Sequence, residues 1–222
     1  MQRLLEHYTV QLDKALYAKD PAVSDIGKDI LHHSVILLAE EGLEAFTFKK
    51  LAQAMASTET TIYRYFHNKH QLMMYLCSWY WSHQEWKLVF ATANISEPKV
   101  LVERAIEVLI SKPSASKMQV MNEELLQRVV CAEFGKVFDI HTKHIEDFEG
   151  YFAAYHNLCE RISAIILLMD KNNKHSMAWA QTIIEASQRQ LFFHYYRKKM
   201  SDCAKDENTI KQFILSLTSS IR

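Results

Sequence analysis

The chain has 222 residues, 49% of them hydrophobic, which is enough to bury a core in one large domain or in a small domain joined to a larger one. Lysine plus arginine equals aspartate plus glutamate at 26 each, so the overall charge gives no sign of a polyanionic partner. The 4 glycines and 3 prolines are few, which favours long helices over a β-sandwich with many turns.

Apolar residues at helical spacing and capping residues predict helices along the whole chain, and no alternation typical of strands appears. We expect capping at Ser24 or Asp25, Thr47, Thr58 and Asn68, and a helix end at Gly42. The expected helices cover residues 5–20, 25–42, 48–55, 58–65, 69–86, 100–112, 118–130, 145–169, 177–200 and 208–221. We therefore predict an all-α fold.

Neither the cysteines nor the apolar segments indicate a secreted or membrane-bound protein. The 4 cysteines have no zinc-like spacing, which is typical of free thiols in a reducing compartment. The first residues lack the apolar core of a signal peptide, and the longest uncharged run, 70–84, is too short and polar to span a membrane. We expect a cytoplasmic protein without membrane contact.

The segment 45–72 has the outline of a helix-turn-helix, whose second helix lies in the major groove of DNA. Two short helices surround a tight turn at Ala56 and Ser57, and a longer helix precedes them. Against the single acid Glu59, the segment carries the cations Lys49, Lys50, Arg64 and Lys69. Phosphates bind where positive charge gathers. The alternative is an ordinary exposed helix with a few capping threonines.

The short hydroxyl side chains of Thr58, Thr60 and Thr61 and the free N–H groups of a first helical turn suit contacts with phosphates and bases. We expect the phenol of Tyr65 and the ammonium group of Lys69 to contact phosphates, and the threonines to influence sequence preference. The candidate DNA-contacting residues are Thr47, Lys49, Thr58, Thr60, Thr61, Tyr63, Arg64, Tyr65 and Lys69.

The stretch 30–72 resembles the N-terminal domain of TetR-family transcriptional regulators. Residues 51–72 align without a gap with the usual Ile-Ala-x-x-Ala-Gly-Val-Ser-x-Gly-Thr-Leu-Tyr-x-Tyr-Phe-x-x-Lys-x-x-Leu. The residues identical to this pattern include Thr61, Tyr63, Tyr65, Phe66, Lys69 and Leu72, and Glu41, Gly42 and Thr47 match the pattern of the preceding helices. The resemblance covers roughly a fifth of the chain.

Several positions depart from that pattern, among them Ser57 in place of the usual valine. Ala56 replaces the turn glycine, and if the turn needs a positive φ, alanine costs about 1 kcal/mol there. Thr60 replaces a glycine within the recognition helix, so base preference is expected to differ. Lys50 replaces the acid that would complete a capping box with Thr47.

The resemblance implies a ligand-responsive, DNA-binding repressor that acts as a homodimer. It implies an N-terminal extension (1–24), a three-helix helix-turn-helix domain (25–75) and a larger helical bundle for ligand binding and dimerisation (76–222). The expected partners are a double-stranded DNA operator and a small-molecule effector of unknown identity, with no cofactor. The alternative is a TetR-like dimer that has lost specific DNA binding and acts as a protein-interaction module. The extension either braces the domain or touches DNA.

Two further groups of residues have both a functional and a structural interpretation. Large apolar side chains in the C-terminal half either line a ligand pocket or fill the core, and the candidates are Phe148, Phe152, Tyr155 and Trp179. An apolar stripe on the last two helices either forms a dimer interface or covers the chain's own core. Its candidates are Ile183, Leu191, Ile210, Phe213, Ile214 and Leu217.

Catalysis and metal binding have little support. Asp139, His141 and His144 lie close together in the sequence, but their spacing forces no complete ligand set, so we predict no metal site. The chain contains no Gly-rich phosphate loop, HExxH or GxSxG motif, and we expect it not to be an enzyme.

Overall fold

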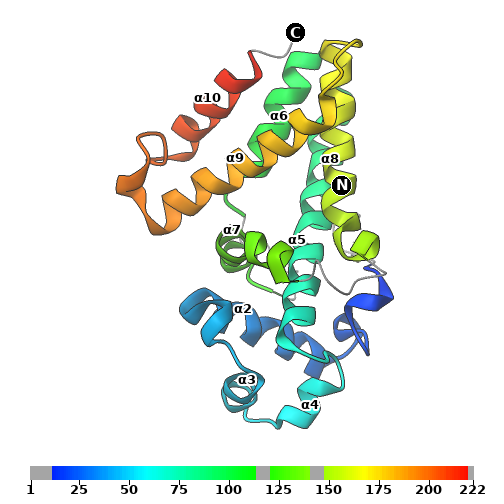
Figure 1. Cartoon of the computed structure of the whole chain (residues 1–222), viewed down its shortest axis with the longest axis vertical. Helices are drawn as coiled ribbons and strands as arrows, with labels where there is room; N and C mark the ends of the chain where they lie inside the picture. Colours follow the sequence, from blue (N-terminus) through cyan, green and yellow to red (C-terminus); the bar gives the residue numbers. More distant parts are fainter. Residues whose placement is uncertain (1–11, 114–120, 141–147, 220–222) are drawn as a thin grey trace. The chain divides into compact units, whose positions relative to one another are not determined.

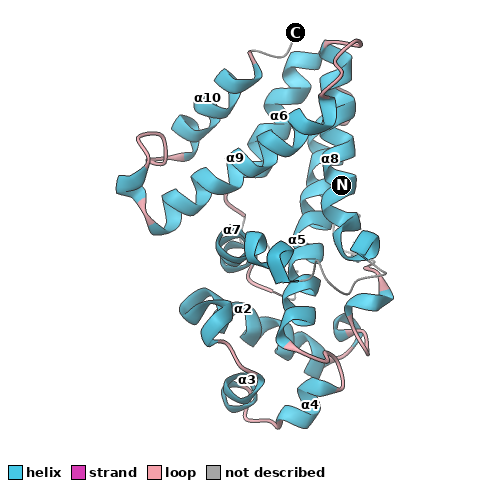
Figure 2. Cartoon of the chain, in the orientation of Figure 1, coloured by secondary structure: helices cyan, strands magenta, loops and turns pink. Residues whose placement is uncertain are grey.

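The computed structural model describes residues 12–113, 121–140 and 148–219, and within these ranges the chain consists of helices and loops without a strand (Figures 1 and 2). The predicted all-α class is confirmed. The 3₁₀ helices are η1 (Lys14–Leu16), η2 (Pro21–Val23) and η3 (Lys198–Met200). The α-helices are α2 (Asp25–Ala45), α3 (Phe48–Ala54), α4 (Glu59–Tyr63), α5 (Lys69–Thr92), α6 (Pro98–Ile110), α7 (Glu123–Ile140), α8 (Phe148–Met169), α9 (Ser176–Tyr196) and α10 (Glu207–Thr218). Among the described residues, none of these helices combines the length and apolar character needed to cross a bilayer.

Side-chain caps begin the helices of the N-terminal region where the sequence predicts them. Ser24 Oγ accepts a hydrogen bond from Gly27 N at 3.1 Å, so Ser24 rather than Asp25 caps α2. Thr47 and Thr58 cap α3 and α4 in the same way. Asn68 Oδ1 accepts from the main-chain N–H of residue 71 at 2.8 Å at the start of α5.

The later helices differ from the predicted ranges. The helix expected at 118–130 is observed as Glu123–Ile140. Asn122 Oδ1 caps its start by accepting from Leu125 N at 3.0 Å, and the helix continues past Val130 through Gly135. The helix expected to reach residue 200 ends at Tyr196, and a 3₁₀ turn follows it.

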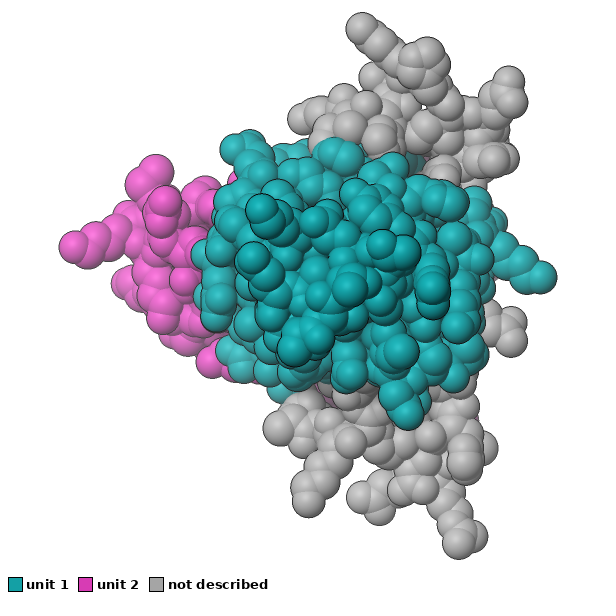
Figure 3. Space-filling model, turned by 90° about the horizontal axis from the view of Figure 1, so that it is seen from below, with its two compact units in different colours: residues 1–80, 113–153 teal, residues 81–112, 154–222 magenta. Residues whose placement is uncertain are grey.

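The chain divides into two compact units, coloured separately in Figure 3. Unit 1 contains residues 1–80 and 113–153, and unit 2 contains residues 81–112 and 154–222. This division differs from the predicted domains 25–75 and 76–222, because α7 packs against α2 within unit 1.

In unit 1, the N-terminal segment is fastened to the chain near residue 65. Ala18 N donates to Tyr65 O at 2.8 Å, and Gln71 Nε2 donates to Ala15 O at 3.0 Å. Leu16 is buried, so its side chain adds apolar contact to these hydrogen bonds. Of the two roles left open for this segment, bracing is the one that its described residues perform.

In unit 2, α10 packs against α6 and α9, and α6 packs against α9. Four of the predicted dimer residues are buried within the chain's own fold: Ile183, Leu191, Ile210 and Ile214. The apolar stripe of α10 is therefore largely buried inside one protomer. A dimer interface on these helices stays a prediction. Of the predicted dimer residues, Phe213 is 36% exposed and Leu217 is half-buried.

Candidate nucleic-acid interface

The turn between α3 and α4 has the hydrogen bonds of a Schellman motif. Ser57 N donates to Ala52 O at 2.8 Å, and Ala56 N donates to Gln53 O at 3.1 Å. Ala56 lies in the left-handed region at φ 50°, where glycine is usual. The turn therefore requires a positive φ, and alanine adopts it at an energetic cost.

Helix α4 is anchored by one side and presents polar side chains on the other. Ile62 and the following Phe66 are fully buried, which fixes the helix on unit 1. Tyr63 is half-exposed with its ring edge-on to Phe48, and Thr61 is half-buried with its hydroxyl 3.1 Å from Thr58 Oγ1. The exposed residues of this helix-turn-helix surface include Thr47, Lys49, Thr58, Glu59, Thr60, Tyr63 and Arg64. Most of the predicted DNA-contacting residues are therefore accessible.

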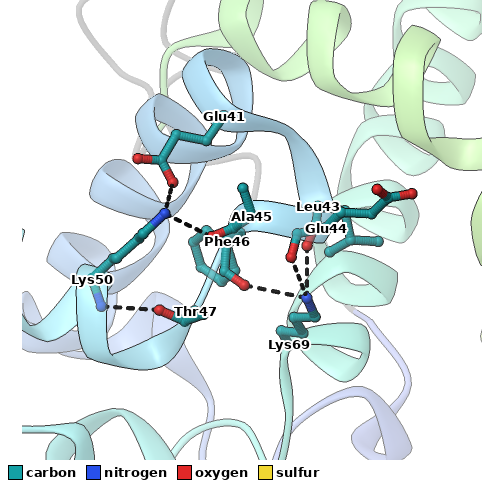
Figure 4. A network of polar contacts seen from close by, with 8 residues as sticks. All are labelled: Glu41, Leu43, Glu44, Ala45, Phe46, Thr47, Lys50 and Lys69. Atoms are coloured by element: carbon teal, nitrogen blue, oxygen red, sulfur yellow. Dashed lines mark hydrogen bonds and ion pairs between the residues drawn. The ribbon is translucent and has the colours of Figure 1, made fainter.

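Tyr65 and Lys69 lie differently from the prediction. Tyr65 is 3% exposed, and its hydroxyl lies 2.8 Å from Ser24 Oγ. Lys19 Nζ lies over the Tyr65 ring, 5.1 Å from its centroid. Lys69 Nζ donates to three main-chain carbonyl groups at the end of α2 (Figure 4). Both side chains are thus engaged in intramolecular contacts, which the prediction of phosphate contacts did not anticipate.

Sequence reasoning missed Ser24 as the partner of Tyr65 and Glu41 as the partner of Lys50. Ser24 was recognised only as a helix cap, although its hydroxyl serves both Gly27 N and the Tyr65 phenol. Glu41 Oε2 accepts from Lys50 Nζ at 2.7 Å. No local pattern connects these residues, because the first pair is 41 positions apart and the second pair belongs to two helices.

The four predicted pocket residues do not form one described cluster. Phe152 is buried in unit 1 with its ring centroid 6.3 Å from that of Phe134. Tyr155 belongs to unit 2, where its hydroxyl donates to Glu185 Oε1 at 3.0 Å, and Trp179 is half-buried there. The side chain of Phe148 lies outside the described residues. An effector pocket at these residues stays a prediction.

Unit 2 contains an open hollow of about 450 Å³, lined by Ala91, Ile95, Arg104, Glu107, Val108 and Ser111. None of the predicted pocket residues lines it. Asp139, His141 and His144, weighed earlier as a metal site, lie where side chains are not described. In the described part of the chain, no group of three or more His, Cys, Asp or Glu residues is placed to hold a metal ion.

Comparison with known proteins gives a family model and similar structures. Residues 30–76 match the model of bacterial regulatory proteins, tetR family. The structure of AibR in complex with isovaleryl coenzyme A and operator DNA is similar over 85% of this chain and 95% of AibR, with TM-score 0.61 and 12% identity. The fatty acid degradation regulator FadR from Bacillus halodurans is similar over 84% of this chain and 93% of its own, with TM-score 0.62 and 13% identity. Apo AibR gives TM-score 0.53 at 12% identity, over 86% of this chain and 96% of its own. No curated protein sequence matches the chain.

Proposed function

We propose that this chain, which belongs to the tetR family of bacterial regulatory proteins through residues 30–76, is a repressor that binds operator DNA and is released by a small molecule. The observation that carries the proposal is the surface of α3 and α4. Buried Ile62 and Phe66 hold α4 in place. Thr60 and Tyr63 on α4, and Arg64 directly after it, are exposed. Such a polar helix surface, fixed from behind, suits the major groove.

Two positive charges on this surface are free to meet phosphates. Lys49 on α3 and Arg64 after α4 are exposed. Ala56 adopts the left-handed conformation that the turn needs, so the departure from glycine no longer argues for a lost helix-turn-helix. The interaction-module alternative therefore loses the observation that motivated it.

The DNA-bound form is proposed to be a homodimer, because two heads can occupy successive half-sites about one helical turn apart. The effector is proposed to shift DNA affinity through its different affinity for two states of the protein. The crystal structure of AibR contains both isovaleryl coenzyme A and operator DNA. Isovaleryl coenzyme A is therefore the first compound to test here.

The test is binding to the DNA upstream of the chain's own gene, measured by gel shift at several salt concentrations. Each phosphate contact contributes about 0.9 to the slope of log affinity against log salt. Lys49→Ala and Arg64→Ala should each weaken binding and reduce the slope by about 0.9. Lys174→Ala, an exposed lysine between α8 and α9, is the matched control and should leave the slope unchanged.

Changes at Thr60 should alter the preference among DNA sequences rather than the salt slope, because base contacts and not phosphates carry sequence information. Wild-type protein that binds specific and random duplexes equally weakly would contradict the proposed function. Isovaleryl coenzyme A is expected to lower the affinity for the operator. An effector without influence on DNA binding would limit the proposal to an unregulated DNA-binding protein.

A further inference from the structure

The carbonyl groups at the end of α2 have an unusual set of partners. Gly42, at φ 77°, breaks the helical geometry, and its oxygen accepts from Phe46 N at 3.2 Å. The next four carbonyls, 43–46, each accept a hydrogen bond from a lysine ammonium group (Figure 4). The last carbonyls of a helix lack intrahelical donors and need such partners.

Lys69, the first residue of α5, donates hydrogen bonds to three of these carbonyls. Its Nζ lies 2.8 Å from Leu43 O, 3.0 Å from Glu44 O and 3.3 Å from Phe46 O. An ammonium group has three N–H donors and no acceptor, so three converging carbonyls match its full donor set. The partial negative charge at a helix C-terminus also favours a cation there.

Lys50, from α3, donates a hydrogen bond to the remaining carbonyl. Its Nζ lies 2.9 Å from Ala45 O and 2.7 Å from Glu41 Oε2. Lys50 stands where the family pattern has an acid that would complete a capping box with Thr47. Here Thr47 Oγ1 still accepts from Lys50 N at 3.3 Å, while the lysine side chain turns back to the end of α2.

We propose that Lys69 and Lys50 are positioning residues, which clamp the turn between α2 and α3 and thereby orient the helix-turn-helix for DNA. The two side chains come from α5 and α3, so they join three helices at one turn. The inference rests on the proposed function, because it assigns these lysines a role in DNA binding. It also divides the local cations, leaving Lys49 and Arg64 as those that meet phosphates.

Arginine substitution separates a clamp from a phosphate contact. A guanidinium group is a planar fork that binds phosphate as well as an ammonium group does, or better. It cannot direct three donors from one atom onto three converging carbonyls. Lys69→Arg should therefore weaken DNA binding as Lys69→Ala does, by roughly tenfold, the loss expected for hydrogen bonds to a charged group. Lys174→Arg, at the exposed lysine between α8 and α9, is the matched control and should bind DNA as tightly as wild type.

The salt dependence of binding gives a second distinction. Both Lys69 variants should keep the wild-type slope of log affinity against log salt, because no phosphate contact is removed. Circular dichroism at the assay temperature verifies that each variant is folded. The proposal is overturned if Lys69→Arg binds like wild type, or if Lys69→Ala reduces the slope by about 0.9.

Hydrogen exchange tests the clamp without DNA. In Lys69→Ala, the amide of Phe46, which bonds to Gly42 O beside the clamp, should exchange faster than in wild type. The amide of Ile184 in α9 of unit 2 is the internal reference and should not change. Wild-type protein without DNA affinity would refute the proposed function alone, whereas unchanged exchange at Phe46 would refute the clamp.

Discussion

Lys49 and Lys50 are adjacent in the sequence, but their ammonium groups have different surroundings. Lys49 is exposed on α3, whereas Lys50 bonds to Glu41 and to the carbonyl of Ala45. A charge that is already satisfied inside the protein contributes less to a phosphate contact than a free one, because breaking its own bonds costs energy. The count of local cations therefore overestimates the charge available to DNA.

Ala56 provides a prediction about stability at this scale. Alanine in the left-handed region is strained, while glycine adopts it freely, although glycine also gains entropy in the unfolded chain. Ala56→Gly should raise the free energy of unfolding by about 0.5–1 kcal/mol. Ala54→Gly, in the last turn of α3, is the control and should lower it. Urea denaturation measures both, and a destabilised Ala56→Gly variant would show that the turn is not strained.

Helix α4 spans only Glu59–Tyr63, far shorter than a helix that is stable alone in water. Its stability must come from its cap and from tertiary packing. Thr58 Oγ1 accepts from Thr61 N at 3.3 Å, and Ile62 is fully buried behind the helix. The recognition surface thus depends on contacts at both the start and the back of one short element.

Removing the cap tests this dependence. Thr58→Ala should destabilise the protein by about 1 kcal/mol, because it removes the acceptor for an N-terminal N–H group of α4. Thr58→Ser retains a capping hydroxyl and should stay within a few tenths of a kcal/mol of wild type. Thermal and urea unfolding of the two variants give the comparison. Equal stability of the alanine and serine variants would mean that the cap is not important.

Helix α10 is held on α6 by ion pairs as well as by apolar packing. Lys211 Nζ lies 2.5 Å from Glu103 Oε1 and 2.7 Å from Glu107 Oε1. The hydrogen bond from Lys211 is the main reason why the pKa of Glu107 is lowered. Hydrogen bonds to Glu103 and Glu107 raise the pKa of Lys211. Both shifts mean that the charged forms favour the folded state.

The sign of these shifts gives a pH-dependent prediction. The contribution of Glu107 is complete above the usual glutamate pKa of about 4.3 and is lost as pH falls through its lowered folded pKa. The contribution of Lys211 is complete below the usual lysine pKa of about 10.4 and is lost as pH rises through its raised folded pKa.

Lys211→Met should therefore be less stable than wild type by about 0.5 kcal/mol at pH 7, a small difference because water screens partly exposed pairs. The difference should shrink as pH falls below the usual glutamate pKa of about 4.3 and through the lowered folded pKa of Glu107. Urea denaturation from pH 3 to pH 8 measures it. A difference that is constant over this range would assign the effect to packing rather than to the ion pairs.

At the scale of the whole molecule, helices α5 and α8 both run from unit 1 into unit 2. Helix α5 begins in unit 1 at Lys69 and ends in unit 2 at Thr92. The same α5 therefore carries the clamp lysine and continues into the unit to which we assign dimerisation. Because most of the predicted dimer residues are buried within the protomer, a dimer must use side chains that remain exposed, such as Phe213.

Substitutions at two adjacent residues of α10 distinguish an effect on dimerisation from an effect on folding. Ile214 is fully buried, so Ile214→Asp should unfold the protein or lower its stability by several kcal/mol, because it buries an unpaired charge. Phe213 is 36% exposed, so Phe213→Asp should leave the protomer folded and weaken the dimer. Circular dichroism and light scattering distinguish the two outcomes. Wild-type protein that stays monomeric at tens of micromolar would contradict the dimer.

Local information in the sequence was sufficient for the helix class, the helix-turn-helix and its caps. Thr47, Thr58 and Asn68 act within three residues of themselves, so their roles depend only on neighbouring backbone. The left-handed turn at Ala56 is equally local, because its two hydrogen bonds join residues at most five positions apart. Short-range geometry of this kind is encoded by residue type and spacing.

The tertiary structure alone decided which polar and apolar side chains remain free. Lys69 meets carbonyls more than twenty positions away, and Ser24 meets Tyr65 across 41 positions. The stripe of α10 is equally compatible with a partner protomer and with α6 and α9 of the same chain, and packing chooses the latter for Ile210 and Ile214. Periodicity identifies a face that must be buried, but only the arrangement of distant segments determines what buries it.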